Sequence, residues 1–290
     1  MAFTLDEDNA LLRAAYKNDN YRVMQGMAED GPCLIFFSGK GLYFPDTEES
    51  FRETVLYKDR YEWARVASRC LPRVSRVILI RDVRKCWYAT GISEKHDTIE
   101  KVITLVKELS GGYRSICIGN SAGGYMAAIA GAAIGADAVY SWGGQSDLRP
   151  FVDISSNRFF TGHADDPAFK DYMEIRNVLS LGDTPLFYFY SAQNERDRDS
   201  AAVMRSIEGT QLFALDSKEH GAGFNTETYV NMFRCDVDRL SALCGEYAEK
   251  PVDAKELGES ICALVPEAER YHETEEKPGL LKRIIRRLAK

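Results

Sequence analysis

Short apolar runs alternate along the chain with longer segments in which apolar residues recur at helical spacing. The runs are apolar almost throughout instead of alternating with polar residues, which is typical of strands that are buried on both faces of a parallel sheet. The predicted strands are residues 33–38, 76–81, 114–118, 136–142, 185–191 and 211–215.

Between these strands the spacing of apolar residues predicts helices. They are expected near residues 58–71, 96–109, 122–134, 166–180, 198–207 and 225–247. Strands that alternate with helices of this length indicate repeated βαβ units, so the fold class is α/β, with a mostly parallel central sheet covered by helices on both faces. We expect one domain over residues 1–250, a helix and acidic linker over 251–276, and a basic amphipathic C-terminal helix over 277–290.

The composition narrows the class of protein. With 45% hydrophobic and 28% charged residues over 290 positions, the chain resembles a soluble globular protein. The first twenty residues are acidic and polar, and no apolar run approaches the ~20 residues that cross a bilayer, so we expect neither a secretory signal nor a membrane span. The seven cysteines are scattered without a CxxC pair, which argues against a disulfide framework or zinc ribbon and favours a cytoplasmic protein.

Charge is distributed unevenly. The net charge is −7, yet residues 277–290 hold six basic side chains and no acidic one, which leaves −13 on the rest of the chain. A body this acidic is not expected to bind nucleic acid. On a helix, the segment 277–290 would present an apolar stripe and a cationic face, which predicts peripheral contact with an anionic membrane at its inner face. Docking on the protein's own acidic surface or on a partner subunit is the alternative; the oligomeric state is left open.

The motif with the clearest chemical meaning is Gly119-Asn120-Ser121-Ala122-Gly123, a G-x-S-x-G sequence. A predicted strand runs into it and a helix rich in small residues runs out of it, which is the context in which this motif forms a nucleophile elbow. The tight turn strains the serine backbone, and the glycines allow strand and helix to approach closely. We therefore expect Ser121 to be a nucleophile; an inert, glycine-rich turn is the alternative.

From this motif and the order of elements, residues 30–245 resemble the α/β-hydrolase superfamily. The resemblance implies the chain order nucleophile, acid, histidine. His220 follows the last predicted strand and is the expected base. The loop after strand 185–191 supplies the acid, for which Asp197 is the first choice, Glu195 the second and Asp199 the third. Such a triad needs no metal or organic cofactor, so none is expected.

The same resemblance predicts the groups that would stabilise an oxyanion. One is the backbone N–H of Ala122, the residue after the nucleophile. The other comes from the loop after strand 33–38, where the donor by position is Lys40 or Gly41.

Five residues are candidates for substrate contact because they follow predicted strands or overhang the expected site. Trp87 and Tyr88 would form an aromatic platform suited to a sugar ring, Trp142 and Gln145 would face the same crevice, and His163 lies in a loop above it. For the aromatic residues, packing in the core is the alternative. The segment 145–182 is too short for a large lid and holds few long apolar side chains, so a small or absent lid and a polar substrate are expected.

These features together predict a serine hydrolase or acyltransferase that acts on an ester. The segments FFSGKG, RDVRKCWYATG and YSAQNERD are also similar to those of α/β hydrolases in bacterial surface-glycan pathways. This similarity implies a small-molecule or glycan ester, such as an O-acylated sugar, as substrate. A catalytically silent scaffold or glycan-binding module is the first alternative, and a thioesterase or peptidase with the same triad is the second.

Overall fold

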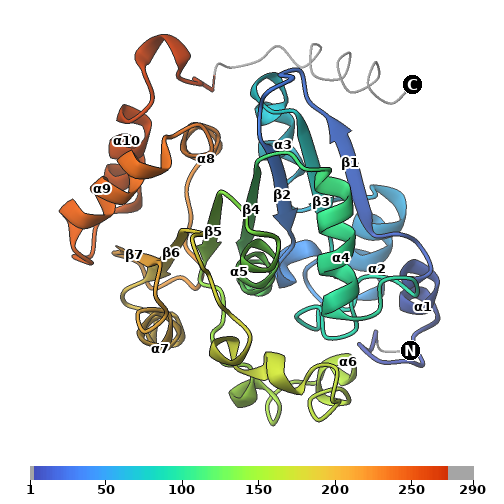
Figure 1. Ribbon diagram of the computed structural model, residues 1–290. Coiled ribbons are helices and arrows are strands. Elements are labelled where there is room, and N and C mark those ends of the chain that lie inside the picture. The colour runs from blue at the N-terminus through green and yellow to red at the C-terminus, as the bar shows by residue number, and fades with distance from the viewer. Residues whose placement is uncertain (1–2, 274–290) are drawn as a thin grey trace.

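A seven-stranded sheet forms the centre of the computed structural model, which describes residues 3–273 (Figure 1). Its order is β1-β3-β2-β4-β5-β6-β7, and every neighbouring pair is parallel except β1 with β3. The strands are β1 (Tyr21–Gln25), β2 (Cys33–Phe37), β3 (Arg76–Ile80), β4 (Ser115–Asn120), β5 (Ala138–Trp142), β6 (Leu186–Ser191) and β7 (Thr210–Leu215). The predicted C-terminal helix over 277–290 lies outside the described residues, as does the end of the linker before it.

The helices cover both faces of this sheet, as the apolar runs predicted. They are α1 (Ala10–Tyr16), α2 (Glu48–Phe51), α3 (Ala64–Cys70), α4 (Ile99–Ser110), α5 (Ala122–Ile134), α6 (Arg158–Thr161), α7 (Glu195–Met204), α8 (Thr226–Met232), α9 (Val237–Tyr247) and α10 (Ala254–Ala263). Helices α1, α4, α5 and α7 share one apolar core with the sheet, whereas α3, α8, α9 and α10 share the other. Alternate residues of each central strand enter opposite cores, as Leu34 and Ile35 of β2 do.

Three of the predicted helices differ in the structure. Of the segment 58–71, only Ala64–Cys70 forms an α-helix. The segment 166–180 forms two short 3₁₀ turns, Lys170–Met173 and Ile175–Asn177, in place of a helix. The segment 225–247 is divided into α8 and α9 because Asp236 caps a new helix, accepting a hydrogen bond from the Arg239 N–H at 3.1 Å. Strand β1 was not predicted, because Tyr-Arg-Val-Met-Gln at the sheet edge is not an apolar run.

The connection between β5 and β6 lies beyond the carboxyl ends of the parallel strands (Figure 1). It holds only α6 and short 3₁₀ turns, so the lid is small, as expected. Beyond residue 250, α10 packs with α8 in the second core through Leu257 and Ile261. Across residues 3–273, none of the helices has the length and apolar character needed to cross a bilayer.

Candidate active site

Ser121 occupies a sharp turn between β4 and α5. Its backbone has φ 53° and ψ −123°, a conformation that residues other than glycine rarely adopt. Its N–H donates to the carbonyl of Trp142 at 2.8 Å. A Cβ on Gly119 would lie 2.1 Å from the carbonyl oxygen of Gly123, and a Cβ on Gly123 would lie 2.3 Å from that of Phe37. Only glycine therefore fits on either side of the serine, as the motif predicted.

The structure brings Ser121, His220 and Asp197 together from three separate segments: the turn before α5, the loop after β7 and the first turn of α7. The Ser121 Oγ lies 2.9 Å from His220 Nε2, and His220 Nδ1 lies 2.5 Å from Asp197 Oδ1. An ionised carboxylate can only accept hydrogen bonds, so Nδ1 carries the imidazole proton and Nε2 is left to accept from the serine hydroxyl. This is the arrangement that activates a serine hydroxyl as a nucleophile.

Asp197 is buried in the first turn of α7, with 1% of its surface exposed. Its second oxygen accepts hydrogen bonds from the N–H groups of Gly221, at 3.0 Å, and Ser191, at 3.2 Å. Burial by itself raises the pKa of Asp197, but the hydrogen bonds from His220 and the backbone outweigh it and hold the pKa below the usual aspartate value. The carboxylate is thus ionised at neutral pH.

The other two acid candidates do not meet His220. Glu195 begins α7 and Asp199 lies one turn further on; both are exposed and line the mouth of a pocket. The helix begins at Glu195, three residues earlier than predicted, because Asn194 caps it by accepting from the Asp197 N–H at 3.2 Å. This cap turns Asp197 inward.

The loop predicted to stabilise an oxyanion lies beside the serine. Lys40 and Gly41 begin a 3₁₀ turn and line a pocket of about 350 Å³ together with Ser121 and His220. Ala122, the other predicted donor, is the first residue of α5, at the helix end where N–H groups lack internal partners. The structure therefore puts all three predicted residues next to Ser121.

Two further residues hold this region in place and carry no sequence signal that identified them. Glu62 Oε2 accepts a hydrogen bond from the Gly39 N–H at 2.6 Å, which removes Gly39 as an oxyanion donor. Asn120 Nδ2 donates to the carbonyl of Gly221 at 2.8 Å, joining the serine turn to the histidine loop.

A larger pocket of about 950 Å³ opens on Ser121 and His220. Gln145 and Trp87 line it, as predicted, and the Trp87 N–H donates to Gln145 Oε1 at 2.9 Å. The rest of its wall mixes apolar side chains such as Phe151 and Ile154 with hydroxyl and charged groups. The site therefore combines a small pocket at the oxyanion loop with a large pocket of mixed polarity.

The aromatic platform is not formed. The Trp87 ring is 2% exposed, with the Lys40 ammonium 3.3 Å from its centroid and Phe160 packed against it. Tyr88 is fully buried and donates to the Ser38 carbonyl at 2.9 Å. The predicted face for a sugar ring is thus covered by the protein's own side chains.

Two more candidates lie away from the pocket. Trp142 is fully buried and stacks on Phe189. Successive side chains of β5 point to opposite faces of the sheet, and that of Trp142 enters the core beside α3 and α8. His163 is half-buried, with Nδ1 2.9 Å from the carbonyl oxygen of Phe159, and it does not line the pocket at Ser121.

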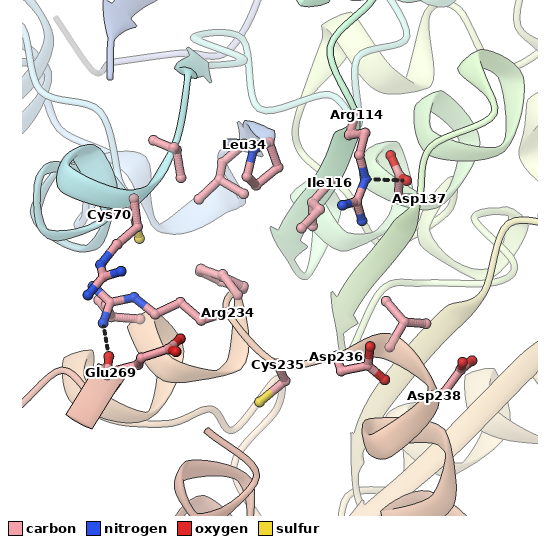
Figure 2. A pocket seen from close by; sticks show the side chains of 16 residues that line it. Leu34, Cys70, Arg114, Ile116, Asp137, Arg234, Cys235, Asp236, Asp238 and Glu269 are labelled. Atoms are coloured by element: carbon pink, nitrogen blue, oxygen red, sulfur yellow. Dashed lines mark hydrogen bonds and ion pairs between the residues drawn. The ribbon is translucent and has the colours of Figure 1, made fainter. Parts of the chain in front are cut away.

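A third hollow lies at the other end of the parallel strands, where their amino ends are (Figure 2). It measures about 460 Å³ and includes Leu34 and Ile116, near the amino ends of β2 and β4, whereas Ser121 follows the carboxyl end of β4. Arg114, seen in Figure 2, pairs with Asp137 at 3.0 Å. This hollow is too far along the strands to share the chemistry of the serine.

Within residues 3–273, no group of three or more His, Cys, Asp or Glu side chains is arranged to hold a metal ion.

The sequence matches no protein-family model and no curated protein. Among solved structures it is similar to a protein of unknown function from Staphylococcus aureus, with 12% identity and a TM-score of 0.50 over 77% of this chain and 94% of that one. It is equally similar to the capsule O-acetyltransferase of Neisseria meningitidis serogroup A, with 11% identity and a TM-score of 0.50 over 79% and 93%. With its sheet order and serine turn, the chain has the α/β-hydrolase fold.

Proposed function

We propose that this protein is a serine hydrolase or acyltransferase that cleaves an ester through an acyl-serine intermediate. The observation that carries the proposal is the continuous set of hydrogen bonds from Ser121 through His220 to the buried Asp197. An inert scaffold has no need of a strained serine, an oriented imidazole and an ionised carboxylate in one line, so the geometry favours an enzyme.

The proposed reaction begins when Ser121 Oγ attacks the ester carbonyl and His220 Nε2 takes its proton. Asp197 stabilises the imidazolium that forms. The N–H of Ala122 and that of Lys40 or Gly41 hold the oxyanion until the alcohol leaves with the proton from His220. Water or a sugar hydroxyl then attacks the acyl-serine, and His220 again moves the proton.

The two pockets support a substrate with a short acyl group and a larger alcohol. The pocket of about 350 Å³ adjoins the oxyanion loop and suits a small acyl group, and the pocket of about 950 Å³ suits the alcohol. Phe151 and Ile154 offer apolar contacts there, and Asn194 and Ser200 offer hydrogen bonds. A sugar ring, with apolar faces and hydroxyl edges, fits this mixture, and we propose an O-acylated sugar as the substrate class. The similar capsule O-acetyltransferase agrees with this choice only at the level of the fold.

Labelling with a fluorophosphonate tests the proposal directly, because the reagent reacts with activated serines. Wild-type protein should be labelled at Ser121, and Ser121→Ala and His220→Ala should lose both the label and at least ~10³-fold of ester turnover while remaining folded. Acetylated sugars, aryl acetates, thioesters and peptides of equal concentration then separate the ester hypothesis from the thioesterase and peptidase alternatives. A folded Ser121→Ala variant that retains wild-type turnover would contradict the mechanism.

A further inference from the structure

Gln145 contacts both reacting side chains from the side opposite the oxyanion loop. It follows β5, which flanks β4 on one side, whereas the Lys40–Leu42 turn follows β2, which flanks β4 on the other. Its Nε2 lies 3.2 Å from Ser121 Oγ and 3.1 Å from His220 Nε2. In the proposed mechanism the leaving alcohol takes its proton from His220 Nε2 and the second nucleophile gives its proton to the same atom, so both are expected beside this amide.

The orientation of this amide is fixed by Trp87. An indole N–H can only donate, so the atom of Gln145 that faces it at 2.9 Å must be the carbonyl oxygen, Oε1. The NH₂ group consequently points at Ser121 and His220. One of its two hydrogens is taken by the carbonyl of Gly143 at 3.2 Å, which leaves one N–H for the reacting centre.

Trp87 is itself held by an unusual loop. The buried carboxyl group of Asp82 accepts hydrogen bonds from the N–H groups of Arg84, Cys86 and Tyr88, at 2.7–3.1 Å. Lys85, Trp87 and Tyr88 all have positive φ, between 53° and 62°, a backbone conformation that is strained for residues other than glycine. Because backbone strain of this kind is usually kept where it has a function, we expect this loop to fix the position of Trp87 at the active site.

We propose, building on the serine-hydrolase function above, that Gln145 is a catalytic residue that holds the oxygen of the water or hydroxyl that releases the acyl group. In the acyl-serine the hydroxyl proton of Ser121 is gone, so His220 Nε2 is free to accept. The oxygen of the entering water or hydroxyl donates its proton to Nε2 and accepts a hydrogen bond from the remaining N–H of Gln145. It then bonds to the acyl carbon, the bond from that carbon to Oγ breaks, and His220 returns the proton to Oγ. Trp87 is a positioning residue that acts through Gln145.

Burst kinetics with p-nitrophenyl acetate separate the two half-reactions. Nitrophenolate leaves without a proton donor, so acylation should depend little on Gln145, whereas attack by water should depend on it strongly. In Gln145→Met we expect the deacylation rate to fall about tenfold, the size expected for one lost hydrogen bond to the reacting oxygen, with acylation changed by less than about threefold. Acyl-Ser121 should accumulate, as measured by mass spectrometry after an acid quench.

Two matched variants distinguish this role from general damage. Trp87→Phe keeps the ring but loses the N–H, so it should slow deacylation in the same direction by a smaller factor. Phe160→Leu disturbs the packing on Trp87, whose ring centroid is 4.5 Å away, without touching the hydrogen bond, and should leave the ratio of the two rates at the wild-type value.

The outcomes separate this inference from the function on which it rests. If wild-type protein is never acylated at Ser121, the proposed function fails. If wild-type protein is acylated but Gln145→Met deacylates at the wild-type rate, or loses both rates equally, the role assigned to Gln145 is overturned.

Discussion

The Glu62 carboxyl group accepts a hydrogen bond from the Gly39 N–H at 2.6 Å, one residue before the turn that we assign to the oxyanion. Glu62 also lines the small pocket at Ser121, so a carboxyl group lies close to the place where negative charge would develop. Burial raises the pKa of Glu62, although the Gly39 hydrogen bond opposes this effect. The fold therefore favours the neutral form of a group that fixes the loop.

This relationship predicts how stability should depend on pH. A carboxyl whose pKa is raised on folding contributes stability that is fully present below its unfolded pKa and is lost as pH rises through its folded pKa. Glu62→Gln keeps an acceptor for Gly39 but cannot ionise. The variant should match the wild-type melting temperature near pH 4 and exceed it by a few degrees near pH 8. Equal melting temperatures at both pH values would show that Glu62 carries no such penalty.

A second prediction concerns the acid. Asp197→Asn should lower kcat by ~10⁴-fold, because an amide in this position favours the wrong imidazole tautomer. Glu195→Gln and Asp199→Asn, in exposed positions that do not meet His220, should change kcat by less than about tenfold and act mainly on KM. If Glu195→Gln proves the most damaging of the three, the hydrogen bond from His220 to Asp197 is not the one used in catalysis.

Asp197 should also make the stability of the protein depend on pH, with a sign opposite to that predicted for Glu62. A carboxyl whose pKa is lowered on folding contributes stability that is present above its unfolded pKa and is lost as pH falls through its folded pKa. Wild-type protein should therefore exceed Asp197→Asn in stability most clearly at neutral pH, and the difference should shrink under acid conditions. Chemical unfolding at pH 7 and pH 3 measures it. A difference that grows toward acid pH contradicts the sign assigned here.

The sequence predicted the six parallel strands because strands buried on both faces are apolar at nearly every position. It did not predict β1, an edge strand that is only partly buried and includes Arg22 and Gln25, nor the 3₁₀ turns after residue 169. There, the pairs Phe169 and Met173, and Ile175 and Leu179, are buried at the i,i+4 spacing of a helix although the backbone forms short turns.

The site residues that could be predicted are those marked by a motif or by the end of a strand. Motif and chain order were sufficient to bring Ser121, His220 and Asp197 together, because these positions follow strand ends at one edge of the sheet. Glu62 was missed because it follows no strand and acts through a contact between distant segments. Trp142 was misplaced because position along the chain does not show which face of the sheet a side chain enters.

A further prediction follows from the close approach of α5 to the sheet. A Cβ on Gly123 would lie 2.3 Å from the Phe37 carbonyl oxygen, and backbone cannot yield as a flexible side chain does. Gly123→Ala should destabilise the protein by about 2–4 kcal/mol and distort the serine turn. Gly245→Ala is the matched control, because nothing lies within 4 Å of its Cβ position in α9, and it should stabilise by about 0.5–1 kcal/mol. Denaturant unfolding of both variants measures the contrast; a neutral Gly123→Ala would show that strand and helix are less tightly apposed.

Lys40 provides the last prediction. Its ammonium lies over the Trp87 ring, and burial lowers its pKa to about 8, although the nearby Asp82 carboxyl opposes this effect. Between pH 8 and the ordinary lysine value of 10.5, the unfolded chain binds more protons at this position than the folded protein does, so Lys40 makes wild-type stability rise with pH over this interval.

Lys40→Met removes that dependence. It should be more stable than wild type by about 1–2 kcal/mol at pH 7, after a discount for the part of the side chain that solvent reaches, and the difference should narrow as pH approaches 10. Lys107→Met, on the exposed face of α4, controls for the loss of one positive charge and should show no such narrowing. If Lys40→Met is less stable than wild type at pH 7, the contact of the ammonium with Trp87 outweighs the cost of burying it, and the sign of this prediction is wrong.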